Sequence, residues 1–340
     1  MAKESLAVKY RPKCWEDVTE QSVVKDILEN QVRTKTVQSA YLFTGPSGTG
    51  KTTSARIFAN MINDGKGNPI EVDAASNSGV DNIRQIIEDA KRKPLDAEYK
   101  IFIVDECHSL SDSSWQALLK TLEEPPKFTI FIFCTTNPEK IPATILSRVQ
   151  RYNFQKISNE GIVERLGYII AQEIVHNEDI IYTEDAVDYI AKVSTGGMRD
   201  AITLLDKCLS LSRTLNIENV LKTIGGEDYS TFITFLSALL EKEKETSIKV
   251  IEDVYTAGKD VKQFMKEFSK FVLEVGKYAL YKNFDYISLP NTLENELEHL
   301  IDDSLFDIMD FVVSLNNQIK WDTDPKTLIE LSILIYCGEE

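Results

Sequence analysis

The chain has 340 residues, of which 43% are hydrophobic and 27% charged, and its formal net charge is −16. This length exceeds one ordinary domain and predicts two or three. The apolar runs are too short to span a membrane, and the first residues, MAKESLAVKYRPK, lack the apolar core of a secretory signal, so we expect a cytoplasmic protein without membrane contact. The acidic balance argues against a surface that coats nucleic acid generally, so any DNA contact would have to come from a local basic strip.

Strand-like and helix-like stretches alternate over the first two-fifths of the chain. The runs AYLFTG, IEVDAA, YKIFIVDE and FTIFIFCTT are short and rich in apolar residues, and amphipathic stretches of helical spacing separate them. Such alternation predicts an α/β domain in which helices cover both faces of a parallel sheet. The almost wholly apolar runs IFIV and FTIFIF favour strands that are buried on both faces.

From about Ile157 onward the strand signals stop, and the rest of the chain has the apolar spacing of helices. Glycine pairs at residues 196–197 and 225–226 bound one short helical region. We therefore expect three domains: an α/β domain over residues 1–157, a small helical domain over 158–222 and an all-helical domain over 223–340.

The segment GPSGTGKT, residues 45–52, fits the phosphate-loop pattern GxxxxGK[ST] between a predicted strand and a predicted helix. Its glycines let backbone N–H groups converge on phosphate oxygens, and the helix N-terminus adds a positive dipole end. Lys51 would neutralise the terminal phosphates, and Thr52 would offer its hydroxyl to Mg²⁺. The candidate ATP-binding residues here are Gly45, Pro46, Ser47, Gly48, Thr49, Gly50, Lys51, Thr52 and Thr53.

Two adjacent carboxylates, Asp105 and Glu106, end the buried run IFIVDE. Beside a phosphate loop, the first carboxylate can hold Mg²⁺ through water, and the second can accept a proton from an attacking water. We therefore expect Asp105 to be a magnesium residue and Glu106 to be the general base.

Two further polar residues are candidates for the same site. Asn137 follows the run FTIFIFCTT and would come to the edge of the sheet where ligands of open α/β sheets bind, so it could orient the lytic water. Arg199 follows a glycine pair at the start of a helix and could reach the phosphates if its domain folds over the nucleotide.

Seven ordered stretches over about residues 1–215 resemble the AAA+ clamp-loader ATPases, and most closely the bacterial DNA polymerase III gamma/tau family. These stretches are KYRPKCWEDVTEQ, GPSGTGKTTSARIFA, VDAASNSGVDNIR, IFIVDECHSL, ALLKTLEEPP, TTNPEKIPATILSR and GGMRDAITLLD. The resemblance implies a P-loop ATPase domain, a helical lid over 158–222 and a helical collar over 223–340. It also implies ATP and Mg²⁺ as cofactors.

In that family ATP binding opens a ring-shaped sliding clamp, the clamp is placed on primer-template DNA, and hydrolysis releases it. The resemblance therefore implies a ring, expected to be pentameric, that contains several copies of this chain with other clamp-loader subunits. The segment Lys9–Pro12, with Tyr10, Arg11 and Pro12, would lie against the adenine. Arg148 in ILSRV matches the arginine finger that completes the ATP site of a neighbouring subunit, whereas we interpret Arg151 as a structural residue.

Four polar residues fall in stretches that, by the same resemblance, face the central DNA chamber or link it to the ATP site. They are Arg84, Lys100, Gln116 and Lys120. From the residues alone, each of them could equally be an ordinary solvated side chain.

The sequence departs from the family at two places. Family members usually carry four zinc-binding cysteines between the phosphate-loop helix and the VDAAS strand, but this chain has only NMINDGKGNPIE there, so we expect no zinc at that place. Val149 replaces the cysteine of the family's SRC sequence, which leaves the arginine assignment intact. We also expect the polymerase- and helicase-binding extensions of the longer family members to be absent.

Two alternatives remain open at this stage. One is a related AAA+ ATPase, such as a small subunit of replication factor C or a branch-migration motor. The other is a scaffold that does not hydrolyse ATP, although the presence of Lys51, Thr52, Asp105 and Glu106 together argues against it.

Overall fold

The computed structural model describes residues 4–176, 179–224, 229–284 and 286–338. Contacts divide the chain into two compact units, one of Met1–Glu178 with Ser194–Asp206, and one of Asp179–Val193 with Lys207–Glu340. The predicted α/β domain lies wholly in the first unit. The helical domain predicted over residues 158–222 contributes to both units, and the three-domain division stays a prediction.

The first unit is built on a five-stranded parallel sheet with the strand order β2-β3-β4-β1-β5, which confirms the predicted sheet. The strands are β1 (Ala40–Thr44), β2 (Ile70–Asp73), β3 (Lys100–Asp105), β4 (Thr129–Thr135) and β5 (Gln150–Asn153). We did not predict β5, because only Tyr152 of its four residues is buried. A polar strand at the edge of a sheet gives no apolar run.

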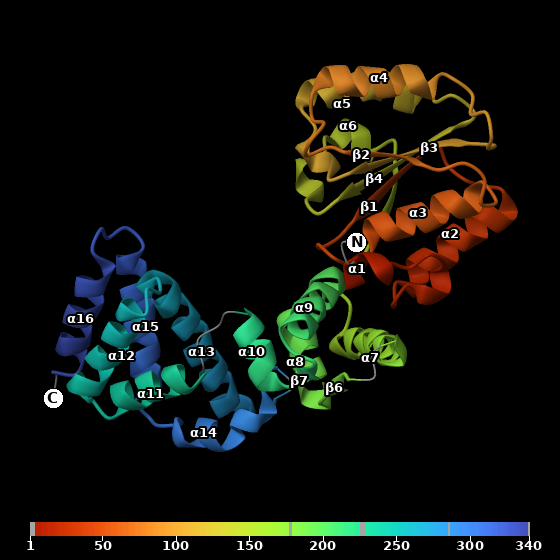
Figure 1. Cartoon of the computed structure of the whole chain (residues 1–340). Helices are drawn as coiled ribbons and strands as arrows, with labels where there is room; N and C mark the ends of the chain where they lie inside the picture. The colour runs from red at the N-terminus through yellow and green to blue at the C-terminus, as the bar shows by residue number, and fades with distance from the viewer. Residues whose placement is uncertain (1–3, 177–178, 225–228, 285, 339–340) are drawn as a thin grey trace. The chain divides into compact units, whose positions relative to one another are not determined.

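Helices cover both faces of this sheet (Figure 1). On one face α2 (Ser22–Thr34) and α3 (Lys51–Ile62) pack against a cluster that includes Tyr41, Phe43 and Ile132. On the other face α4 (Val80–Ala90) and α5 (Asp112–Glu123) pack against a cluster that includes Leu42, Phe131 and Phe133. Successive residues of one strand therefore enter opposite cores, which explains why the central strands are apolar at nearly every position.

Shorter elements and part of the helical region complete the first unit. They are α1 (Leu6–Lys9), η1 (Trp15–Asp17), η2 (Cys107–Ser109), η3 (Pro138–Lys140), α6 (Ala143–Leu146), α7 (Asn159–His176) and the start of α9 (Met198–Leu211). The polar residues that follow β1, β3 and β4 lie at the carboxyl edge of the sheet, as parallel strands require.

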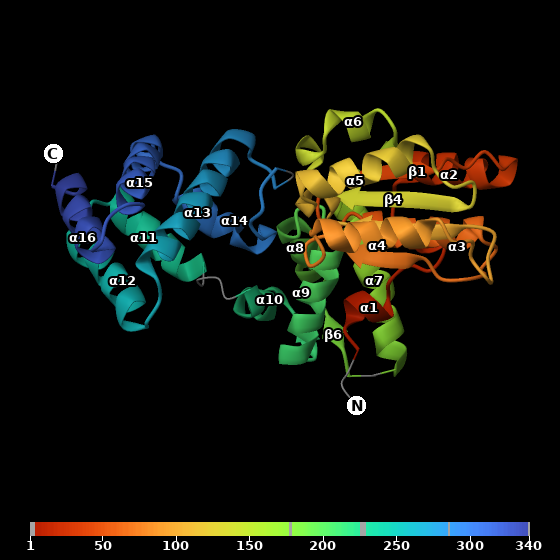
Figure 2. The same ribbon diagram turned by 90° about the horizontal axis from the view of Figure 1, so that it is seen from above.

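The second unit is mainly helical. Its helices are α8 (Glu184–Val193), α10 (Ile217–Ile224), α11 (Tyr229–Leu240), α12 (Lys244–Thr256), α13 (Val261–Tyr281), η4 (Asn291–Leu293), α14 (Glu294–His299), α15 (Leu305–Ile319) and α16 (Pro325–Tyr336). The long α13 lies beside α15 (Figure 2). Its Phe264, Phe268 and Phe271 enter a core that is shared with α11, α12, α14, α15 and α16. Within the described residues, every helix is too short or too polar to cross a lipid bilayer.

The prediction that strands end at about Ile157 was wrong in one detail. The second unit contains a parallel pair of two-residue strands, β6 (Ile181–Tyr182) and β7 (Thr214–Leu215). Three of these four residues are exposed, and two residues are too few to produce an alternating pattern in the sequence.

Replacing Phe131 by alanine should destabilise the first unit strongly. Phe131 is fully buried in the central strand β4, and its ring stacks on those of Phe102 and Phe133 with centroid distances of 5.2 and 6.0 Å. We expect Phe131→Ala to lower the free energy of unfolding of this unit by about 3–5 kcal/mol, measured by chemical denaturation of the full chain. The fully exposed Leu95, changed to alanine, is the control and should stay within about 0.5 kcal/mol of the unchanged protein.

Candidate nucleotide-binding site

The phosphate loop connects β1 to α3 and adopts a backbone conformation that requires glycine at three positions. Gly45, Gly48 and Gly50 have φ values of 148°, 72° and 96°. A Cβ atom on Gly45 would lie 2.3 Å from the carbonyl oxygen of Phe154, and one on Gly48 would lie 3.1 Å from Cα of Gly197. Neighbouring backbone therefore touches the loop on two sides, and side chains at these glycines would disrupt both contacts.

Lys51 begins α3 with its ammonium group directed at the loop. Its Nζ donates hydrogen bonds to the carbonyl oxygens of Gly45 at 2.9 Å and Pro46 at 2.7 Å. Burial lowers the pKa of Lys51, while the nearby carboxylates of Glu106 and Asp105 act in the opposite direction. The predicted phosphate-binding cation is thus mostly buried, where its charge is least screened by solvent.

Thr52 and Asp105, the two predicted magnesium residues, are in contact. The Thr52 hydroxyl donates a hydrogen bond of 2.8 Å to the Asp105 carboxylate. A hydroxyl and a carboxylate oxygen at the end of a phosphate loop are hard donors of the kind that Mg²⁺ binds together with phosphate oxygens. The residues present therefore fit a magnesium ion that arrives with a nucleotide.

Glu106 follows β3 in a left-handed conformation with φ 46°. One oxygen of its carboxylate accepts a hydrogen bond of 3.1 Å from the Thr136 hydroxyl and lies 3.2 Å from Nδ1 of His108. The same His108 nitrogen is 3.1 Å from the hydroxyl of Thr135. The predicted general base is therefore held by residues from η2 and the end of β4. His108 was not predicted as a site residue, although it lies two residues after Glu106.

Asn137 lies at the same edge of the sheet but does not line the cavity described below. Its backbone N–H donates a hydrogen bond of 3.0 Å to the Thr135 hydroxyl, and the residue precedes η3. Its proposed role in orienting water stays a prediction.

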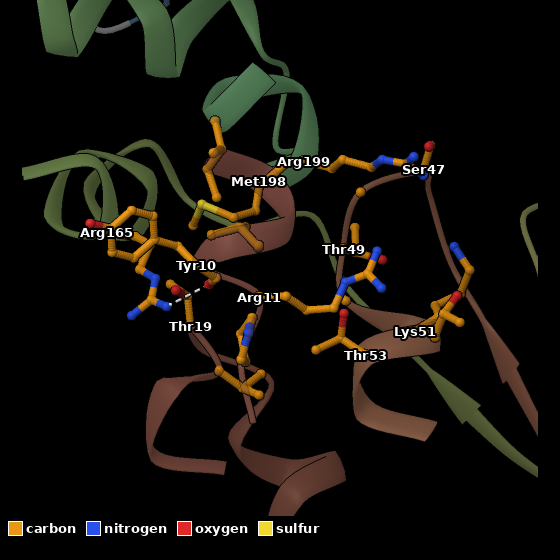
Figure 3. A pocket seen from close by; sticks show the side chains of 18 of the residues that line it. Tyr10, Arg11, Thr19, Ser47, Thr49, Lys51, Thr53, Arg165, Met198 and Arg199 are labelled. Atoms are coloured by element: carbon orange, nitrogen blue, oxygen red, sulfur yellow. Dashed lines mark hydrogen bonds between the residues drawn. The ribbon is translucent and has the colours of Figure 1, made fainter. Parts of the chain in front are cut away.

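The site residues surround one cavity of the first unit (Figure 3). Most of the predicted residues line it: Tyr10, Arg11, Pro12, Ser47, Gly48, Thr49, Gly50, Lys51, Thr52, Thr53, Asp105, Glu106 and Arg199. Other lining residues were not predicted: Ala7, Asp17, Val18, Thr19, Ile157, Arg165, Met198 and Ile202. The cavity thus has a polar end at the phosphate loop and a more apolar end between the N-terminal segment, α7 and α9, as a nucleotide requires.

The N-terminal segment is held on α7 by hydrogen bonds to side chains that were not predicted as site residues. The guanidinium of Arg165 donates to the carbonyl oxygen of Tyr10 at 3.0 Å, the bond drawn in Figure 3. The carboxylate of Glu173, which is 4% exposed, accepts from Nζ of Lys9 at 2.6 Å and from the Tyr10 hydroxyl at 2.8 Å. Both partners come from α7, so this helix fixes the segment predicted to contact adenine.

Two arginines bring further positive charge to the cavity. Figure 3 shows Arg11 directed toward Thr49 and Thr53, and Arg199 directed toward Ser47. Burial lowers the pKa of Arg11, and the neighbouring cations Arg56 and Arg199 lower it further. Arg199 is brought to the loop by the backbone of the preceding residue, because the N–H of Met198 donates a hydrogen bond of 3.1 Å to the carbonyl oxygen of Gly48.

Comparison with known proteins identifies the family. Residues 68–158 match the model described as DNA polymerase III, delta subunit, and residues 162–214 match DNA polymerase III clamp loader subunit, ATPase lid domain. The chain is 31% identical to DNA polymerase III subunit gamma of Buchnera aphidicola subsp. Acyrthosiphon pisum over 294 residues, which cover 79% of this chain and 80% of that protein. The chain belongs to the DNA polymerase III gamma/tau family.

Longer members of the gamma/tau family also match. The chain is 32% identical to DNA polymerase III subunit tau of Bacillus subtilis, and the match covers 99% of this chain but 64% of that protein. Against the gamma/tau subunit of Mycoplasma genitalium it is 33% identical, with 86% of this chain and 53% of that protein covered. The chain thus spans between about half and two thirds of these longer relatives.

A solved structure shares the AAA+ fold of this gamma/tau family member. The Thermotoga maritima RuvB Holliday junction branch migration motor superposes with a TM-score of 0.51 over 68% of this chain and 80% of that one. The two sequences are 22% identical, so this likeness supports the fold alone.

Arg148, the residue of this family member predicted to act as a finger, does not line the cavity. It follows α6, and its guanidinium contacts Glu123, Thr144 and Ser147. Arg151, which we interpreted as structural, lies in β5 with an exposed side chain. Arg148 therefore lies in the turn after α6, whereas Arg151 lies in the edge strand β5.

The four residues predicted to face DNA or to couple it to the site lie on three elements. Gln116 and Lys120 are exposed on α5 at a spacing of four residues, so they share one face of that helix. Arg84 on α4 pairs with Asp81 at 3.0 Å. Lys100 at the start of β3 is largely buried and binds Asp89 at 3.0 Å, so its ammonium is engaged within its own unit. The DNA role of all four stays a prediction.

Lys51→Ala should abolish most nucleotide binding. The change removes the buried ammonium at the loop, and hydrogen bonds to charged groups are worth about 1.5–3 kcal/mol each, so we expect ATP affinity to fall roughly 100-fold or more. Isothermal titration calorimetry of the full chain measures this. The exposed Lys66, changed to alanine, is the matched control. Unchanged affinity in Lys51→Ala would show that the loop does not hold phosphate.

Thr52→Val should remove the hydroxyl predicted to bind Mg²⁺ while preserving the shape of the side chain. We expect ATP affinity in the presence of Mg²⁺ to fall about tenfold, because a hard oxygen donor is lost, whereas affinity in excess EDTA should change less than about threefold. The comparison of the two conditions is the measurement. Equal losses in both conditions would contradict a metal role for Thr52.

Proposed function

We propose that this chain is an ATP-hydrolysing subunit of a DNA polymerase III clamp loader. In a ring with other loader subunits and further copies of itself, it opens a sliding clamp and places it on primer-template DNA in the cytoplasm. Membership of the gamma/tau family and the match to a clamp-loader lid model support this proposal. A cavity that gathers a phosphate loop, the carboxylates of Asp105 and Glu106, and the cations Lys51, Arg11 and Arg199 supports the ATPase step.

The position of Arg148 outside the cavity supports the proposal independently of the family match. The cavity brings together Lys51, Thr52, Asp105 and Glu106, but Arg148 lies outside it and is held by other residues. An arginine that stabilises transferred phosphate charge must reach the phosphate. Arg148 therefore fits a role at the nucleotide of a neighbouring copy, and this supports a ring rather than an isolated ATPase.

In the proposed hydrolysis each residue of the site has a separate role. Lys51, Arg11 and Arg199 attract and orient the phosphates by charge, and Tyr10 and Pro12 border the base end of the cavity. Thr52 and Asp105 would hold a magnesium ion, which would supply charge neutralisation for the terminal phosphates. Glu106, kept in place by Thr136 and His108, accepts the proton of the attacking water. Arg148 of the adjacent copy completes the charge stabilisation.

A scaffold role without hydrolysis fits the site less well. A protein that only binds partners has no need for a buried lysine over a phosphate loop, a paired hydroxyl and carboxylate, and a second carboxylate held at the same edge. Absence of ATP turnover in the complete assembly, with clamp and primed DNA present, would favour the scaffold.

Arg148→Ala should separate binding from turnover. We expect the variant to bind ATP as well as the unchanged chain, because Arg148 does not line its own cavity, and to lose turnover by roughly 10³-fold or more in the assembly. Calorimetry measures binding, and phosphate release in the presence of clamp and primed DNA measures turnover.

Mixed assemblies test whether Arg148 acts on a neighbour. Subunits with Lys51→Ala lack their own nucleotide but supply a finger, whereas subunits with Arg148→Ala hold nucleotide but lack a finger. Combining the two should restore part of the turnover at the mixed interfaces. If the mixture is as inactive as either variant alone, Arg148 does not act in trans.

A further inference from the structure

Arg148 is held on the surface of the first unit by three acceptors. Its Nη2 donates to Oε1 of Glu123 at 2.5 Å. Its Nη1 donates to the carbonyl oxygen of Thr144 at 2.6 Å and to the Ser147 hydroxyl at 3.0 Å. The side chains of Arg148 and Glu123 are 32% and 49% exposed, so the pair is accessible from solvent.

The two partners stand on firmly packed elements. Glu123 is the last residue of α5 and follows the buried Leu122, while Arg148 comes three residues after the buried Ile145 of α6. The two helices pack against each other. The position of the guanidinium is thus set by the packing of α5 on α6, and a long side chain that could take many rotamers is restricted to one place.

A carboxylate at this position is unfavourable for the helix itself. The C-terminal end of α5 carries partial negative charge, so Glu123 there is destabilising unless a cation offsets it. Arg148 supplies that cation, although the two residues are 25 positions apart. These contacts occupy only some of the N–H groups of Arg148. A guanidinium has five N–H donors, and the three acceptors occupy three of them. Two donors remain for a phosphate group.

We propose that Glu123 is a positioning residue for Arg148, which it presents to the nucleotide of a neighbouring copy. This inference rests on the proposed role of Arg148 in trans. Glu123 touches no nucleotide itself, and it acts only through the direction and restricted motion that it gives the guanidinium. An exposed ion pair is weak, so Glu123 orients the arginine without competing strongly with a phosphate.

A mixed assembly isolates the effect. One subunit carries Lys51→Ala and supplies the finger, and the other carries Arg148→Ala and holds the nucleotide, so the turnover measured comes from interfaces where the first meets the second. Adding Glu123→Ala to the finger-supplying subunit should lower kcat about three- to fivefold and leave KM for ATP within about twofold. Adding it to the nucleotide-holding subunit should leave both constants unchanged.

Two variants control for charge and folding. Glu124→Ala removes a neighbouring exposed carboxylate at the end of α5 and should not change kcat. Glu123→Gln keeps an oxygen that accepts from Nη2 and should retain at least about half of the activity. Thermal unfolding midpoints of all variants should agree within about 2 °C, because Glu123 is half-exposed.

The outcomes separate this inference from the proposed function. If Arg148→Ala in the finger-supplying subunit leaves kcat unchanged, the trans role fails and this inference fails with it. If that change lowers kcat but Glu123→Ala does not, only the positioning role is wrong. A rise in kcat with Glu123→Ala, or an equal loss with Glu124→Ala, would also overturn it.

Discussion

The contact of the phosphate loop with backbone on two sides is the constraint on which the site depends. Gly45 lies against the carbonyl of Phe154, just after β5, and Gly48 lies against Gly197, just before α9. Side chains at these places would push the loop away from its neighbours. Because the loop and the start of α9 touch through glycines and share the bond from Met198 to Gly48, Arg199 reaches the loop without any long connection.

The distribution of charge in the molecule follows from this arrangement. The chain carries a net charge of −16, yet Lys51, Arg11 and Arg199 converge on one cavity. Cations close together repel, and the pKa of Arg11 is lowered first by burial and then by the neighbouring cations Arg56 and Arg199. Asp105 and Glu106 offset part of this charge. A polyanion such as a nucleotide relieves the rest, so the acidic surface does not prevent anion binding at this place.

How much of the site could be predicted depended on how locally it is encoded. The phosphate loop, Asp105 and Glu106 follow predictable strands and carry short patterns, so the sequence was sufficient to find them. The partners that hold the N-terminal segment were missed because they are distant in the chain: Arg165 is 155 residues from Tyr10, and Glu173 is 164 residues from Lys9. Likewise a family pattern indicates Arg148, but nothing in that pattern indicates Glu123. The edge strand β5 and the short pair β6–β7 have too few buried residues to be seen.

Hydrogen bonds to α7 order the N-terminal segment before a nucleotide binds. The cavity is assembled from five separate stretches of chain, and a loose cavity of that kind would have to be ordered at the expense of binding free energy. Here hydrogen bonds from Lys9, Tyr10 and Arg165 already hold the base end on α7, and the bond from Met198 to Gly48 holds the phosphate end. Little ordering is then left for the nucleotide to bring about within the first unit. In the ring proposed above, the binding energy of the nucleotide would then be available for changes between subunits, which the opening of a clamp requires.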